Sequence, residues 1–218
     1  MPEKKHQILL VDDHPLVRES LASLINQQPD LAVCGEAESV KQALDYLSKT
    51  SPDMAIIDLS LKESSGLDLI KTVKTAYPHI GMIVLSMHDE RHYAERAIRA
   101  GARGYVMKRE TTKKIIAAIH QVMAGKLGVS EEVAALFAEK FVDTRPRSGT
   151  PVEELSDREL EVFRLLGTGL DTRSVANRLE ISIKTVQAYC ARIKDKLNLA
   201  NATELLREAI RWNESDAL

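Results

Sequence analysis

The chain has 218 residues, of which 44% are apolar and 28% charged, and its formal net charge at pH 7 is −2. This balance is typical of a globular protein and excludes disordered and fibrous classes. The small net charge also argues against a protein that is basic throughout and binds nucleic acid over its whole surface.

Two further patterns bear on where the protein acts. The sequence has no apolar run of the roughly 18 residues that a membrane span needs, and its first residues lack the pattern of a signal peptide. Cys34 and Cys190 lie far apart, without metal-site spacing, so we expect reduced thiols. We therefore predict a cytoplasmic protein with no membrane partner.

The first half alternates short apolar runs with amphipathic helical patterns. The runs predict strands at residues 7–11, 31–34, 52–57, 80–85 and 104–107. Apolar residues at helical spacing follow each run, and Ser39 and Asp89 stand where helix N-caps are expected. This alternation predicts an α/β fold with a five-stranded, doubly wound parallel sheet.

Polar side chains follow four of these strands directly. They are Asp12, Asp13, Asp58, Ser86 and Lys108. On its own, Asp58 is equally well interpreted as an ordinary aspartate at a strand end. The carboxyl ends of parallel strands share one edge, however, and ligands of such sheets bind there.

The residue types at this edge indicate a particular chemistry. Three clustered carboxylates repel one another without a cation, and hard oxygen ligands suit Mg²⁺. A carboxylate beside a metal and a lysine is an arrangement for phosphoryl transfer, because the carboxylate attacks phosphorus while the cations neutralise the equatorial oxygens. The Ser86 hydroxyl could hydrogen-bond the phosphoryl group once it is attached.

Residues 7–125 resemble the receiver domain of a two-component response regulator. The matching positions are Asp12, Asp13, Asp58, Gly66, Ser86, Tyr105 and Lys108. The resemblance implies a flavodoxin-like fold in which Asp58 is the phosphoacceptor and Lys108 and Ser86 assist it. Such a domain catalyses only its own phosphorylation and dephosphorylation, so we do not expect an enzyme acting on other substrates.

The resemblance also implies a metal site and a switch. Mg²⁺ (or Mn²⁺) would bind Asp12, Asp13, Asp58 and the main-chain carbonyl of Ser60, and the switch positions are Ser86 and Tyr105. The chain departs from the family at two places where proline is common, Lys62 and Arg109. These departures affect loop rigidity and partner contacts rather than the chemical groups.

A linker separates the two halves. We predict a receiver domain over 1–126, a partly helical linker over 127–151 and a second domain over 152–218. Residues 130–142 have an apolar helical face that could pack on either domain or on a second subunit, and the polar residues 143–151 indicate a tether.

The second half predicts four helices. Ser156 and Glu159 form a capping-box pattern, and two short helices joined by a tight turn, the second capped by Ser182, form a helix-turn-helix pattern. Residues 171–198 contain six basic and three acidic side chains, a local net charge of +3. We thus predict a small all-α domain with a basic face.

Residues 152–212 resemble the LuxR-type DNA-binding domain of the NarL/FixJ group, through the pattern around Ser156 and the run Lys184-Thr185-Val186. The resemblance implies that the helix after Ser182 lies in the major groove of double-stranded DNA. Its contact residues would be Lys184, Thr185, Gln187, Ala188, Ala191, Arg192 and Lys194. Candidate dimer contacts on the last helix are Asn201, Leu205 and Leu206.

The recognition helix is less charged than is usual in this group, because Gln187 stands where relatives commonly carry lysine. Two functions are compatible with the two resemblances and with this less charged helix. The first is a transcription regulator that a histidine kinase phosphorylates and that binds paired half-sites as a homodimer. The alternative is a phosphorylation-dependent signalling adaptor whose C-terminal domain binds protein rather than DNA.

Overall fold

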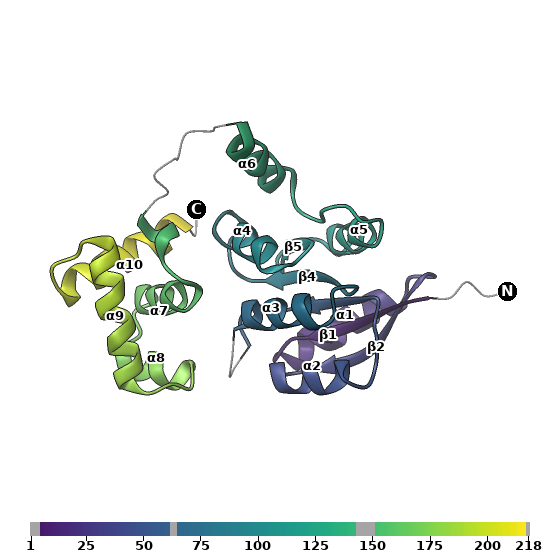
Figure 1. Ribbon diagram of the computed structural model, residues 1–218, viewed down its shortest axis with the longest axis horizontal. Coiled ribbons are helices and arrows are strands. Elements are labelled where there is room, and N and C mark those ends of the chain that lie inside the picture. Colours follow the sequence, from purple (N-terminus) through teal and green to yellow (C-terminus); the bar gives the residue numbers. More distant parts are fainter. Residues whose placement is uncertain (1–4, 62–64, 143–150, 217–218) are drawn as a thin grey trace. The chain divides into compact units, whose positions relative to one another are not determined.

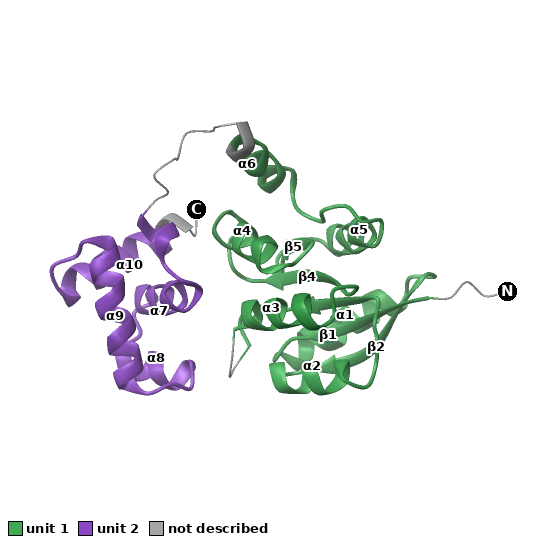
Figure 2. Ribbon diagram, in the orientation of Figure 1, with its two compact units in different colours: residues 1–142 green, residues 143–218 purple. Residues whose placement is uncertain are grey.

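The computed structural model describes residues 5–61, 65–142 and 151–216 (Figure 1). The chain forms two compact units, residues 1–142 and 143–218 (Figure 2). Lys62, one of the two departures from the receiver pattern, lies outside the described residues. No helix within the described ranges is long and apolar enough to cross a membrane.

The first unit is built on a five-stranded sheet whose neighbouring strands are all parallel. The strands are β1 (His6–Val11), β2 (Leu31–Ala37), β3 (Met54–Ile57), β4 (Gly81–Ser86) and β5 (Gly104–Met107). Their order in the sheet is β2-β1-β3-β4-β5. The strand order therefore reverses beside β1, as in a doubly wound sheet, and the predicted α/β fold is confirmed.

Helices cover both faces of this sheet, which is why its strands are apolar on both sides. Ile8 of β1 packs in one core with Ile25 and Ile119, which come from two different helices. Leu9, which points to the other face, is 0% exposed. The helices are α1 (Pro15–Asn26), α2 (Val40–Leu47), α3 (Gly66–Ala76), α4 (Glu90–Ala100) and α5 (Thr112–Met123).

Local signals in the sequence set the beginnings of these helices. The Ser39 side chain accepts a hydrogen bond from the Gln42 amide, and Asp89 caps α4 in the same way, as predicted. At Gly66, where α3 begins, a Cβ atom would overlap the main-chain carbonyl oxygen of Asp58. Only glycine allows this helix to approach the end of β3 so closely.

The first unit extends further along the chain than the predicted receiver domain, because residues after 126 attach to it. The Tyr105 amide donates to the Gly128 carbonyl (2.9 Å), which lengthens the sheet edge at β5. Val133 of the helix α6 (Glu131–Val142) is 1% exposed. Ser130, the residue immediately before this helix, donates to Glu90 of α4 (2.6 Å). The apolar helix of the predicted linker thus packs on the first unit.

The second unit consists of four α-helices preceded by a short 3₁₀ helix, as far as it is described. They are η1 (Pro151–Glu154), α7 (Asp157–Gly167), α8 (Thr172–Arg178), α9 (Ile183–Leu197) and α10 (Ala202–Asp216). Both hydrogen bonds of the predicted capping box at Ser156 and Glu159 are present, and Ser182 caps α9. The rings of Phe163 and Trp212 lie 5.9 Å apart in its core.

Candidate functional site

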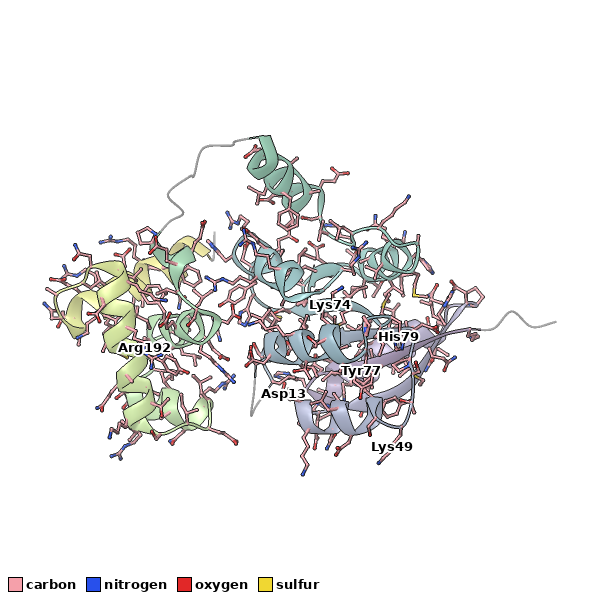
Figure 3. The ribbon with its side chains drawn as sticks, viewed as in Figure 1. Asp13, Lys49, Lys74, Tyr77, His79 and Arg192 are labelled. Atoms are coloured by element: carbon pink, nitrogen blue, oxygen red, sulfur yellow. The ribbon has the colours of Figure 1, made fainter. Side chains whose placement is uncertain are left out.

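The sheet brings the predicted polar residues together at one edge, at the carboxyl ends of its strands. Asp12 and Asp58 are each 3% exposed, Asp13 is 8% exposed and Ser86 is fully buried. Asp13 is labelled in Figure 3, on the segment that leads from β1 to α1. Side chains from four loops therefore converge because parallel strands end at a common edge.

Lys108 occupies the centre of this acidic edge. Its Nζ atom lies 2.6 Å from Asp12 Oδ2 and 2.7 Å from Asp58 Oδ2, and its side chain is 8% exposed. Loss of hydration on burial opposes the lysine charge, but the two carboxylates outweigh it and raise the pKa of Lys108. Lys108 therefore stays protonated and holds Asp58 beside a positive charge.

Asp58 itself is affected by two opposing influences. Burial raises the pKa of the Asp58 carboxyl above its ordinary value, although the neighbouring Lys108 ammonium lowers it. The Ser60 amide donates to Asp58 Oδ1 (3.2 Å), so both carboxylate oxygens have a donor. These two hydrogen bonds hold the Asp58 carboxylate in one orientation at the carboxyl end of β3.

The acidic edge also has the composition of a cation site. Asp12, Asp13, His14 and Asp58 each place a potential ligand atom within 4.8 Å of the others. Asp13 Oδ1 is buried without a hydrogen-bond partner among the described residues, although the His14 ring nitrogen lies 2.8 Å away. Buried carboxylate oxygens clustered in this way suit a hard divalent cation, so these residues fit a metal ion.

The two predicted switch residues are joined through His88. Tyr105 is 1% exposed and its hydroxyl donates to the His88 carbonyl (2.9 Å), while Ser86 Oγ accepts from the His88 amide (3.2 Å). The His88 ring is 2.8 Å from Ser60 Oγ and stacks on Tyr93 with centroids 4.6 Å apart. Burial also raises the pKa of Tyr105 well above its ordinary value. His88 thereby links the loops that follow β3 and β4.

Sequence reasoning missed His14 and His88. His14 follows the acidic pair directly, so its position in the sequence was a usable signal. His88 had no comparable signal, because its contacts depend on how the loop after Ser86 folds. Arg109, the other departure from the receiver pattern, follows Lys108 through a trans peptide bond and lies 4.0 Å from Asp89.

In the second unit, the predicted DNA-contact residues share one side of α9. Lys184, Gln187, Ala188, Ala191 and Arg192 are exposed. Thr185 and Lys194 are half-buried, and the Thr185 hydroxyl lies 2.7 Å from the Ser182 hydroxyl at the start of the helix. The opposite side of α9 supplies Val186 and Ile193 to the core, and both are 0% exposed.

The candidate dimer residues, Asn201 just before α10 and two leucines within it, divide between surface and core. Asn201 is exposed and Leu206 is 41% exposed, so both can meet a partner. Leu205 is 3% exposed and packs inside the unit, so its predicted role in a dimer contact is wrong. The helical phase explains the difference, because adjacent residues point about 100° apart. Ile210, one turn after Leu206, is 37% exposed. The exposed apolar surface of α10 therefore includes Leu206 and Ile210 rather than Leu205.

Comparison with known proteins agrees with this geometry. Residues 8–120 match the response regulator receiver domain, and residues 153–209 match the luxR family of bacterial regulatory proteins. The chain belongs to the response regulators. Its receiver and LuxR-type DNA-binding domain are the arrangement of the NarL/FixJ group, which confirms the resemblance inferred from the sequence.

Several relatives of this response regulator match along nearly the whole chain. Fimbriae Z protein of Salmonella typhimurium is 32% identical over 93% of this chain and 95% of its own length. The oxygen regulatory protein NreC of Staphylococcus epidermidis is 30% identical, over 94% and 97%. The nitrate/nitrite response regulator NarL of Escherichia coli is 28% identical, over 90% and 91%.

Solved structures of RcsB from Salmonella resemble the response regulator in fold. One, from Salmonella typhimurium, has a TM-score of 0.70 at 26% identity, covering 95% of this chain and 98% of that one. Another, from Salmonella enterica serovar Typhimurium bound to promoter P1flhDC with the phosphomimetic BeF3−, has a TM-score of 0.67 at 26% identity and covers 94% and 98%.

Proposed function

We propose that this response regulator is a phosphorylation-controlled regulator of transcription in which Asp58 accepts a phosphoryl group from a phosphohistidine of a partner kinase. The observation that carries the proposal is the acidic edge, where the Asp58 carboxylate lies 2.7 Å from Lys108 Nζ and in one cluster with the buried carboxylates of Asp12 and Asp13. Among protein sites, this combination suits transfer of a phosphoryl group to a carboxylate.

Each residue then has a defined part in the reaction. An Asp58 carboxylate oxygen attacks phosphorus and the phosphorus–nitrogen bond breaks. The donor imidazole, which carries a proton on its other ring nitrogen, keeps the electron pair of the broken bond and leaves as neutral imidazole. Lys108 balances the negative charge that gathers on the phosphoryl oxygens, and the Ser86 hydroxyl hydrogen-bonds one of them. Water later cleaves the acyl phosphate, so the domain acts on its own phosphoryl group only.

A divalent cation, Mg²⁺ or Mn²⁺, would complete this site. Asp12, Asp13, Asp58 and the Ser60 carbonyl would hold it, and when bound it would supply further positive charge to the phosphoryl oxygens. The cluster of three buried carboxylates supports this assignment, as does the hydrogen bond from the Ser60 amide to Asp58. The His14 ring borders the same cluster.

The second unit would deliver the output. We propose that α9 enters the major groove of double-stranded DNA and that two copies of the chain bind paired half-sites, because one short helix contacts too few bases for useful specificity. The similar RcsB structures include a promoter complex and RcsB dimers bound to DNA. The exposed Leu206 and Ile210 of α10 offer an apolar surface for a homodimer. A regulator that binds chromosomal DNA would act in the cytoplasm.

The test combines phosphorylation with DNA binding. The full chain and an Asp58→Asn variant are incubated with Mg²⁺ and acetyl phosphate, and binding to a randomised duplex library is followed with and without the donor. We expect donor-dependent selection of paired sites by the unsubstituted chain and none by the variant. Phosphorylation of the variant at the same rate would contradict the acceptor assignment.

The same experiment separates the regulator from the signalling adaptor. Two small residues, Ala188 and Ala191, on the exposed side of α9 are the observation that favours the adaptor, because they reduce the basic character of a DNA-reading helix. Binding to duplex DNA that weakens steeply with salt supports the regulator. Negligible duplex binding at any salt concentration, with or without donor, supports the adaptor.

A further inference from the structure

The exposed side of α9 has an unusual distribution of charge. At 3.6 residues per turn, Lys184, Ala188 and Ala191 fall within about 60° of one another around the helix. Arg192 lies about 80° to one side of Lys184, and Lys194 lies about 80° to the other. The exposed side therefore begins with Lys184 in the first turn, carries two methyl groups at its centre in the next two turns, and has Arg192 and Lys194 at its flanks.

Lys184, Ala188 and Ala191 form a stripe along the exposed side of α9, and this stripe has a defined beginning and end. Lys184 begins it in the first turn of α9, and Asp195, which is exposed at nearly the same angle, ends it. A carboxylate there would repel a phosphate backbone, so only the N-terminal three turns suit contact with DNA. This agrees with the usual docking of a recognition helix, in which the N-terminal residues meet the bases.

Arg192 lies over an aromatic ring of its own helix. Its guanidinium carbon lies 5.2 Å from the centroid of the half-buried Tyr189 ring, one turn before it (Figure 3 labels Arg192). A cation stacked on an aromatic ring gains a modest attraction and loses rotational freedom. Tyr189 lies still further around the helix from the alanines, so it draws the guanidinium away from the centre of the stripe.

These positions decide which base edges the helix can recognise. Guanine is most often read by a bidentate arginine or lysine, and beyond Lys184 in the first turn the central positions, Ala188 and Ala191, offer neither. Alanine methyl groups instead pack against the C5-methyl group of thymine, and a glutamine such as Gln187 pairs with N6 and N7 of adenine. The small side chains also let the helix backbone come close to the base edges.

We propose that the central base pairs of the half-site are A·T pairs. Gln187 reads adenine, and Ala188 and Ala191 contact thymine methyl groups. Lys184 contacts a phosphate at the N-terminal end of the helix, and Arg192 and Lys194 contact phosphates on the two sides of the groove. This inference rests on the proposed DNA-binding function and specifies its ligand. It assigns base reading to three uncharged side chains and positioning to the flanking cations.

The test begins with a selected site. The full chain, treated with beryllofluoride and Mg²⁺, selects duplexes from a randomised library, and we expect A·T pairs at the centre of each half-site. Each central thymine is then replaced by deoxyuridine, which removes only the C5-methyl group. Each replacement should weaken binding about fourfold, as expected for removal of one buried methyl group. Replacement of thymines outside the half-sites is the matched control.

Protein variants locate the contact. In Ala188→Gly and Ala191→Gly, deoxyuridine at the position that the deleted methyl group touched should have no further effect, and circular dichroism verifies that α9 still folds. In Gln187→Ala, the preference for adenine at one position should relax. The deoxyuridine comparison leaves the protein unchanged, so it decides the matter even where a variant folds poorly.

Each result is decisive. Selected half-sites with a G·C centre, or binding that is indifferent to deoxyuridine, overturn the A·T inference and leave the proposed DNA-binding function standing. Absence of duplex binding by the treated chain at low salt overturns the proposed function, and the inference with it. An A·T centre whose thymine methyl groups each contribute several-fold to affinity supports both.

Discussion

The two candidate sites of this response regulator place their charges in opposite environments. Lys108 is 8% exposed between two buried carboxylates, whereas Lys184 and Arg192 on α9 are exposed. Buried charges interact strongly and are little screened, so each one determines the state of its neighbours. Exposed charges are screened by water and salt until a partner covers them. Single substitutions should therefore have large, coupled effects at the acidic edge and small, separate effects on α9.

The largest expected effect comes from Lys108→Met. Its ammonium is the positive charge that lies against Asp58, so its loss removes a preorganised group that stabilises the transferring phosphoryl oxygens. We expect the rate of acyl phosphate formation from acetyl phosphate, at saturating Mg²⁺, to fall about 10²- to 10³-fold. Mass spectrometry of the intact chain over time gives that rate.

Lys114→Met is the matched control for Lys108→Met. Lys114 also forms an ion pair, 2.8 Å from Glu110, but its side chain is 65% exposed. An exposed pair of this kind contributes little, so phosphorylation should change less than about twofold. Equal losses in the two variants would show that burial does not distinguish these lysines.

The second unit also contains a buried charge, so the contrast between buried charges in the first unit and exposed charges in the second is incomplete. Glu159 is 2% exposed, accepts from the Ser156 amide (2.8 Å) and lies 2.7 Å from Lys196 Nζ. Glu159→Gln removes the charge from both bonds and should lower the free energy of unfolding of this unit by about 2 kcal/mol. Trp212, the single tryptophan of the chain, lies in this unit and reports its unfolding by fluorescence.

The effect of Glu159 should depend on pH in a defined direction. Burial opposes its charge, but the bonds to Lys196 and Ser156 outweigh this and lower the pKa of Glu159 from 4.5. Its stabilising contribution is therefore complete above about pH 4.5 and disappears as the pH falls through the lowered value. The difference from Glu159→Gln should shrink over that range, whereas Glu208→Gln, in an exposed pair with Arg211, should change stability by less than about 0.5 kcal/mol throughout. A difference that grows on acidification would contradict the assigned pairing.

A smaller effect is expected where α6 attaches to the first unit. Ser130 donates to Glu90 (2.6 Å) and also accepts from the Val133 amide, so it both fastens and caps α6. Ser130→Ala should reduce the hydrogen-exchange protection of the α6 amides about tenfold, since the two hydrogen bonds together are worth about 1.4 kcal/mol. Glu90→Ala keeps the cap and should reduce protection by less. Ser20→Ala, which loses only a bond to a carbonyl of its own helix, is the control.

Much of this structure could be predicted from the sequence because its causes are local or topological. The capping box needs only Ser156 and Glu159 at the right spacing, and the meeting of Asp12, Asp58 and Lys108 follows once the strands are parallel. The regular alternation of strands and helices supplied that topology. These features do not depend on the details of packing.

Other features depend on packing and could not be predicted. Leu205 and Leu206 are identical neighbours, and only the rotation of α10 against the core decides that Leu205 is buried. The end of the first unit at Val142 depends on the Gly128 pairing with β5 and the Ser130 contact to α4. The contacts of His88 require the folded loop, which no spacing in the sequence predicts.

The smallest expected effect tests the exposed side of the comparison. Tyr189→Phe keeps the ring beneath Arg192, whereas Tyr189→Leu removes it, and a cation–π contact at an exposed site is worth about 0.5–1 kcal/mol. Tyr189→Leu should therefore weaken binding to the selected duplex about two- to fivefold, and Tyr189→Phe should have little effect.

Arg192→Gln should lower the slope of log affinity against log salt by about 0.9 for each phosphate that the protein no longer neutralises, which fluorescence anisotropy at several salt concentrations measures. Adding Tyr189→Leu to Arg192→Gln should then cost nothing further, because the ring acts through the arginine. An effect of Tyr189→Leu that persists without Arg192, or that approaches the effect of Lys108→Met, would mean that this tyrosine contacts DNA itself and that the exposed helix is as strongly coupled as the buried edge.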